Sequence, residues 1–249
     1  MSEIVPDPWS GWRAHTPARI ALGRTGVSLP TREVLAMAEA HAQARDAVHR
    51  PLDVAALVAA LVVAALGEVA VVASAAPDRA SYLRRPDLGR TLSEGSRLQP
   101  VADVDLVLVL ADGLSPAAVL EQGPAVIAAA TPMLRAAGFR FVCVVATQAR
   151  VALGDAVARA LGVAAVAVLI GERPGLSVPS SLGIYVTWQP QPGVTNDAAR
   201  NCISNIQPNG LDAASAAAKL VWLLTAARAR GLSGVALKDE SEGAPLIGR

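Results

Sequence analysis

Residues 105–116 read DLVLVLADGLSP, and this stretch decides the fold class. The apolar run from Leu106 shows no alternation of polar and apolar residues, which is typical of a strand buried on both faces of a sheet. Asp112-Gly113 then indicates a turn, and the segment from Ala117 is helix-forming. The stretch therefore predicts a strand, a turn and a helix in succession.

The same plan recurs toward the C-terminus. Three more apolar runs predict buried strands, at Phe139–Ala146, Ala164–Ile170 and Ile184–Trp188. Helical segments follow at Gly154–Leu161 and, after the capping residue Asp212, as far as Arg230. Buried strands that alternate with helices form a parallel sheet with helices on both faces. We predict an α/β fold, a Rossmann-like doubly wound parallel sheet, over residues 101–249.

The first hundred residues have a different pattern and predict a mainly helical N-terminal region, residues 1–100. Helices are expected at Arg32–His49 and at about 53–66, followed by a short strand at Val69–Ala73. Residues 74–100 hold many charges, glycines and prolines, and we expect irregular structure with short helices at most.

Composition excludes several classes of function. Lys and Arg number 22 against 21 Asp and Glu, so no net field attracts nucleic acid. A basic cluster, Arg79, Arg84, Arg85 and Arg90, is interleaved with Asp78 and Asp87 and is interpreted as a solvated face or a subunit contact. The uncharged run between Asp53 and Glu68 is shorter than the roughly 20 residues that span a bilayer. No secretory signal is visible at the start, so we expect a cytoplasmic protein.

The usual catalytic motifs are missing from the sequence. It contains no dinucleotide-binding Gly-x-Gly-x-x-Gly, no P-loop and no nucleophile elbow. The two cysteines and three histidines show no metal-ligand spacing, so we expect no metal site. Cys202 lies far in sequence from every histidine, which argues against a thiol nucleophile.

A ligand site is expected beyond the carboxyl ends of the strands, where loops of an open α/β sheet converge. Four segments qualify: Asp112-Gly113, Ala149-Arg150-Val151, Gly171-Glu172-Arg173 and the loop that carries Cys202. Glu172 has two interpretations. It either forms an ion pair with Arg173 that ties down the loop, or accepts hydrogen bonds from a ligand that Gly171 and Gly175 allow to approach closely.

Several segments resemble one protein family and occur in the order found there. They are Ser28–Arg32, Tyr82–Arg90, Ala111–Ser115, Gly171–Leu176 and Asn201–Ile206. The family is the small, or light-chain, subunit of ethanolamine ammonia-lyase, and the similarity extends from Thr16 to Gly234. One departure is Ala149, where the family usually has glycine, which matters only if that glycine has a positive φ.

The resemblance implies a function that composition alone does not. Ethanolamine ammonia-lyase uses adenosylcobalamin to convert ethanolamine to acetaldehyde and ammonia. In the family a large TIM-barrel subunit holds the substrate, the small subunit helps enclose the cobalamin, and the assembly is a trimer of dimers of heterodimers. The family's cobalamin contacts fall on Val151, Glu172 and Cys202. No histidine lies in an Asp-x-His-x-x-Gly motif, so the cobalt is expected to keep the cofactor's own dimethylbenzimidazole ligand.

Two other functions stay open from the sequence. One is a non-catalytic scaffold subunit without direct cofactor contact. The other is a free-standing Rossmann-like enzyme that uses Glu172 and Cys202 chemically. Enclosure in a bacterial microcompartment is also left open, because some family members use a longer N-terminal extension for it.

Overall fold

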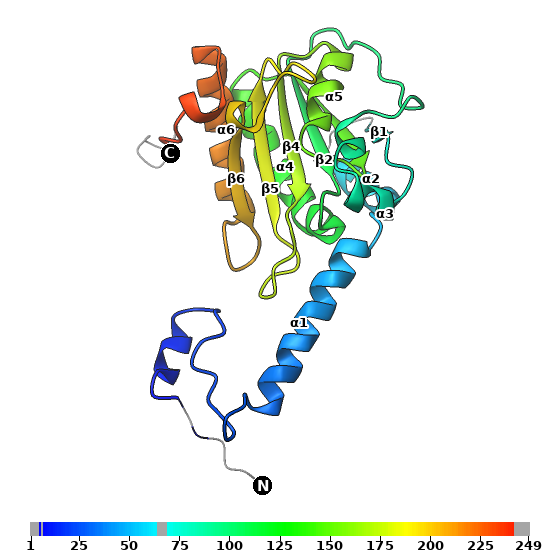
Figure 1. The fold of residues 1–249 in the computed structure, drawn as a ribbon. Helices are drawn as coiled ribbons and strands as arrows, with labels where there is room; N and C mark the ends of the chain where they lie inside the picture. Colours follow the sequence, from blue (N-terminus) through cyan, green and yellow to red (C-terminus); the bar gives the residue numbers. More distant parts are fainter. Residues whose placement is uncertain (1–4, 6, 64–68, 242–249) are drawn as a thin grey trace.

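A six-stranded sheet forms the centre of the protein (Figure 1). The structure is a computed structural model, which describes residues 5, 7–63 and 69–241. Its strands are β1 (Ala70–Ala73), β2 (Leu106–Ala111), β3 (Phe141–Thr147), β4 (Ala165–Gly171), β5 (Leu182–Trp188) and β6 (Asn201–Ile206). Their order is β1-β3-β2-β4-β5-β6. The strands β1 to β4 are parallel, with pairings such as Leu108 to Cys143 and Leu108 to Ala167.

The α/β class is confirmed, but the sheet is mixed, so the prediction of a wholly parallel, doubly wound sheet is not confirmed. Strand β5 runs antiparallel to β4, and β6 runs antiparallel to β5. The reason lies in the connection of residues 172–181, which contains no helix. A parallel pair needs a crossover of a dozen or more residues, whereas a short link returns the chain in the opposite direction.

Cys202 was expected in a loop, and this prediction was wrong because the residue lies in β6, opposite Tyr185 of β5. The segment NCISNI buries Ile203 and Ile206 and leaves Cys202 and Ser204 exposed. Such a strand is covered on one face only, so its polar residues resemble those of a loop.

Helices cover the two faces of the sheet unequally. The larger core lies between the sheet and α2 (Val54–Val63), α4 (Pro116–Ala136) and α6 (Ala213–Arg230). The smaller core lies on the opposite face, where α5 (Leu153–Leu161) packs on β2 and β4. The predicted helix ends are confirmed for α6, since Asp212 accepts a hydrogen bond from the Ser215 N–H and Gly231 has a φ of 68°.

The apolar segment near residue 54 is a core helix in its described part, because Leu57 and Leu61 of α2 are fully buried. Residues 64–66 of the predicted helix lie outside the described residues. Among the residues described, one helix, α4, has the length and composition to cross a bilayer. It buries Ile127 and Leu134 against the sheet, as a helix of a protein core does.

The N-terminal part extends away from the sheet, as Figure 1 shows for α1 (Thr31–His49). Within α1 the only buried residue is Ala40. Arg79 Nε donates to the Val48 carbonyl at 2.8 Å and holds the end of α1 near the sheet. Residues 74–100 contain only the short helix α3 (Arg79–Arg84) and the turn η2 (Leu88–Arg90), as predicted.

Candidate functional site

Three of the predicted segments meet at one edge of the sheet. Asp112, Ala149 and Glu172 follow the carboxyl ends of the parallel neighbours β2, β3 and β4. This part of the prediction is confirmed, because parallel strands end at the same edge.

Asp112 organises the loop after β3. Its buried carboxylate accepts hydrogen bonds from the Gln148 N–H at 2.8 Å, the Ala149 N–H at 3.0 Å and Arg79 Nη1 at 3.2 Å. Burial raises the pKa of Asp112, while Arg79 and the two N–H groups oppose the rise. The left-handed backbone of this loop is at Gln148, with a φ of 53°, and not at Ala149. The replacement of the family's usual glycine by Ala149 therefore causes no strain.

The segment Tyr82–Arg90 packs against the loop after β3 and supports it. Tyr82 is fully buried, and its hydroxyl donates to the Ala149 carbonyl at 3.1 Å. The guanidinium carbons of Arg79 and Arg150 lie 4.8 and 4.4 Å from the Tyr82 ring centroid. A Cβ on Gly89 would come within 2.8 Å of Arg150 Cγ, so this position has room for glycine alone. Sequence reasoning recorded this motif but missed what it supports.

Gly171 permits a close approach of the chain to itself. A Cβ on Gly171 would lie 2.0 Å from the Ser115 carbonyl oxygen and 2.7 Å from that of Asp112. The Leu114 N–H donates to the Gly171 carbonyl at 2.9 Å. The turn after β2 and the end of β4 are thereby held together, and this contact fixes the backbone position from which the Glu172 side chain extends.

Glu172 is half-buried, and its contacts test the interpretation that it forms an ion pair with Arg173. Its Oε2 accepts hydrogen bonds from Ser181 Oγ at 2.5 Å and from the Asn205 N–H at 3.3 Å. Among the described residues no ion pair joins Glu172 to Arg173, so the ion-pair interpretation is wrong for this structure. The carboxylate instead bridges the end of β4 to the end of β6.

Strands β5 and β6 bring Tyr185 and Cys202 next to Glu172. Although Cys202 as a whole residue is exposed, partial desolvation of its thiol raises the thiol pKa; the charge of Glu172 adds to the rise, and the contact with Tyr185 opposes it. Burial also raises the pKa of Tyr185, with further contributions from Cys202 and Glu172. A raised thiol pKa lowers the fraction of thiolate and so makes Cys202 a weaker nucleophile. Tyr185 was missed from the sequence because its place depends on the antiparallel register.

A buried ion pair connects the Val151 side of this region to the Cys202 side. Arg200 donates two hydrogen bonds of 2.7 Å to the carboxylate of Asp155 and one of 3.0 Å to Thr187 Oγ1. Asp155, in the first turn of α5, lies four residues after Val151, and Arg200 lies two residues before Cys202. Val151 and Tyr185 both pack at the border of the smaller core. Three elements, α5, β5 and β6, are thus cross-linked on one face of the sheet.

Comparison with known proteins identifies the family of the chain. The family model of the ethanolamine ammonia-lyase light chain matches residues 6–238. The chain belongs to the ethanolamine ammonia-lyase light-chain family. A protein of Ralstonia nicotianae named ethanolamine ammonia-lyase small subunit is 50% identical over 98% of this chain and 92% of its own length. Proteins with the same name from Rhodopseudomonas palustris and Azotobacter vinelandii are 52% and 48% identical, over 92% and 99% of this chain and 89% and 94% of their own lengths.

The open region of this light chain lies on the α5 side of β5 and β6. Cys202 and Ser204 are exposed there and Tyr185 is half-buried, while Ile203 on the other side belongs to the core under α6. Glu172 and Cys202 are brought together at this face, and Val151 lies at its border with the smaller core. No cluster of His, Cys, Asp or Glu suited to a metal occurs in the described part of the light chain.

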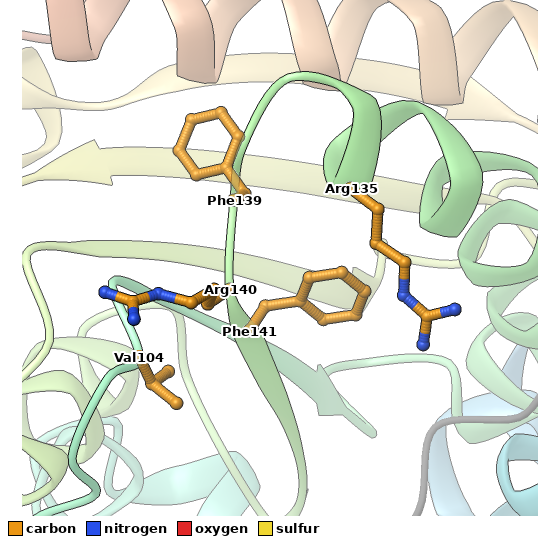
Figure 2. A pocket seen from close by; sticks show the side chains of 5 residues that line it. All are labelled: Val104, Arg135, Phe139, Arg140 and Phe141. Atoms are coloured by element: carbon orange, nitrogen blue, oxygen red, sulfur yellow. The ribbon is translucent and has the colours of Figure 1, made fainter.

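A hollow elsewhere on the light chain is a weaker candidate for a site. Figure 2 shows it, lined by Val104, Arg135, Phe139, Arg140 and Phe141, at the edge of the sheet where β3 begins. Arg140 already pairs with Asp103 at 2.9 Å. Because the hollow lies where β3 begins, it is at the opposite end of the strands from Glu172, which follows the end of β4.

Proposed function

We propose that this chain is the small subunit of an adenosylcobalamin-dependent ethanolamine ammonia-lyase, which converts ethanolamine to acetaldehyde and ammonia. In this proposal it helps enclose the cobalamin against the large catalytic subunit. Membership of the family over residues 6–238 is the observation that carries the proposal. The open face beside Glu172 supports it. The divisions 1–100 and 101–249 remain a prediction, and β1 at Ala70–Ala73 joins the sheet from the N-terminal side of that boundary.

The residues at the open face fit the periphery of a corrin. Cobalamin is surrounded by carboxamide groups whose N–H donors need acceptors. Glu172 offers a carboxylate, and its Oε1 has no hydrogen-bond partner among the described residues. Strand β6 is at the edge of the sheet, so backbone groups of Cys202 and its neighbours are open to pairing. Val151 offers a half-buried apolar contact.

The part of this chain in the reaction would be to bind and orient. When bound, adenosylcobalamin supplies the radical chemistry, and the protein contributes position and enclosure. The raised thiol pKa of Cys202 favours a packing contact over a nucleophile. Glu172 is held by Ser181 and Asn205, so it would meet the cofactor with little rearrangement. Substrate would stay on the large subunit.

A partner subunit is supported by exposed apolar side chains on the N-terminal part. Trp9 and Trp12 are 65% and 58% exposed, and Val34 and Leu35 of α1 are 51% and 63% exposed. Patches of this kind mark protein contacts. The large subunit is the proposed partner, in a trimer of dimers of heterodimers, and the complex is proposed to be cytoplasmic, with enclosure in a microcompartment left open.

The test is co-expression with an ethanolamine ammonia-lyase large subunit, followed by an assay for acetaldehyde with each subunit alone as control. We expect activity from the pair only. Glu172→Gln should then raise the Kd for adenosylcobalamin about tenfold, because it replaces a charged acceptor with a neutral one. Glu121→Gln, an exposed change on α4 across the sheet, should leave the Kd unchanged. Assembly with an unchanged Kd in Glu172→Gln would favour the scaffold instead.

A further inference from the structure

We propose that Arg150 binds the phosphodiester of the cobalamin nucleotide loop. This inference rests on the proposed function and names a cofactor contact in addition to Val151, Glu172 and Cys202. It starts from the charge balance around Tyr82, where the loop after β3 meets the segment Tyr82–Arg90.

Arg150 is a half-buried cation without a carboxylate partner in the described part of the chain. Its guanidinium lies 4.4 Å from the Tyr82 ring centroid, and its Nη2 donates one long hydrogen bond, 3.4 Å, to the Tyr82 carbonyl. Its Nε is buried and has no hydrogen-bond partner. A partly desolvated cation of this kind is costly unless it is paired with an anion.

The carboxylate of the same cluster cannot supply that anion, because it is already bound. Asp112 accepts hydrogen bonds from Arg79 and from the N–H groups of Gln148 and Ala149. The carboxylate of Asp112 pairs with Arg79 alone, so Arg150 is left without a counter-charge in this cluster. Arg79 Nη2 and Gln148 Oε1 are also buried without a partner. The cluster therefore has an excess of one positive charge and unused hydrogen-bonding capacity.

The position of Arg150 indicates which anion fits. It directly precedes Val151, one of the proposed corrin contacts, and the Arg150 N–H is held by the Gly89 carbonyl at 2.8 Å. The groups around the corrin are neutral amides, whereas the nucleotide loop carries a phosphodiester with one negative charge. A guanidinium matches phosphate oxygens with paired donors and is fixed here by the Tyr82 ring. The contact would set which end of the cofactor faces the loop after β3.

The experiment compares two corrinoids that differ by the phosphate. The complex of this chain with its large subunit is dialysed against adenosylcobinamide phosphate or adenosylcobinamide, and bound corrinoid is read from its absorbance. We expect the wild-type complex to bind the phosphate form at least about tenfold more tightly. Arg150→Gln should reduce that preference to about one. Arg159→Gln, an exposed change in the last turn of α5, should keep it.

Arg150→Met is measured alongside, since it keeps an apolar stem against Tyr82 and guards against loss of folding in the glutamine variant. A preference that survives either variant in a folded complex would overturn the inference. So would weaker subunit association with an unchanged preference, which would assign Arg150 to a carboxylate of the large subunit. A wild-type complex that binds both corrinoids equally would also overturn it. A wild-type complex that binds neither would refute the proposed function itself.

Discussion

The Asp155–Arg200 ion pair should respond in opposite ways to single and double replacement. Both side chains are at most 2% exposed and share two hydrogen bonds of 2.7 Å. Asp155→Leu leaves a buried guanidinium with only the exposed Asp197 nearby, at 3.6 Å and without a hydrogen bond, which costs about 3–5 kcal/mol of unfolding free energy. Total stabilities are of the order of 5–15 kcal/mol, so the loss is large. For a chain of this length it corresponds to a fall in Tm of roughly 6–20 °C.

The double variant Asp155→Leu with Arg200→Met removes both charges, so no desolvated ion remains. Buried pairs replaced by apolar residues of similar volume are often as stable as the original. We expect the double variant to unfold within about 1–2 kcal/mol of wild type, allowing for the lost bond to Thr187. Urea denaturation followed by circular dichroism measures all four corners of the cycle. Single replacements that cost under about 1 kcal/mol would refute the reasoning, because that is the range of exposed pairs.

Three further predictions follow from the site. Gly171→Ala should prevent folding or strongly destabilise the protein, since the added Cβ would overlap the Ser115 carbonyl. In the control, Gly175→Ala, the nearest atom is 3.5 Å from the added Cβ, so the Tm should change little. Equal melting temperatures for the two variants would contradict the packing. Because burial raises the pKa of Cys202, its alkylation at pH 8 should be slower than that of a free cysteine and should speed up only at higher pH. Cys143, with a pKa raised to about 12, should stay unlabelled. Mass spectrometry of the alkylated protein measures both. With the cofactor bound, the cobalt resonance spectrum should show the cofactor's own benzimidazole nitrogen, and a protein histidine signal would refute this expectation.

The positions of β1 to β5 could be predicted from the sequence, but the strand β6 and the direction of β5 could not. Buried strands appear as unbroken apolar runs, and Leu182–Trp188 reads as such a run in either direction. The direction follows from the connection of residues 172–181, which lacks a helix-forming pattern. Ile203 and Ile206 are three residues apart, which is not the alternation of a strand, because the pairing of β6 with β5 shifts register. This irregularity is why β6 was not predicted.

The residues of the candidate site likewise fall into two groups, those that could be predicted from the sequence and those that could not. Asp112 and Glu172 could be placed because residues after parallel strands share an edge, a rule that needs only the strand ends. Tyr185, Arg200 and Asp155 could not, since their contacts depend on the antiparallel register of β5 and β6. Val151 and Cys202 lie in segments that the expected strand ends had already indicated, and the resemblance to the light-chain family selected these two residues without any knowledge of that register.

Polar cross-links take the place of a covering helix at the open face. Helix α5 packs on β2 and β4, so the α5 side of β6 is not fixed by apolar packing. Arg200 joins β6 to α5 through Asp155, and Glu172 joins the end of β4 to Asn205. These bonds hold β5 and β6 in place while leaving the face free for a ligand. A covering helix would hold the strands equally well but would occupy the surface on which we place the corrin.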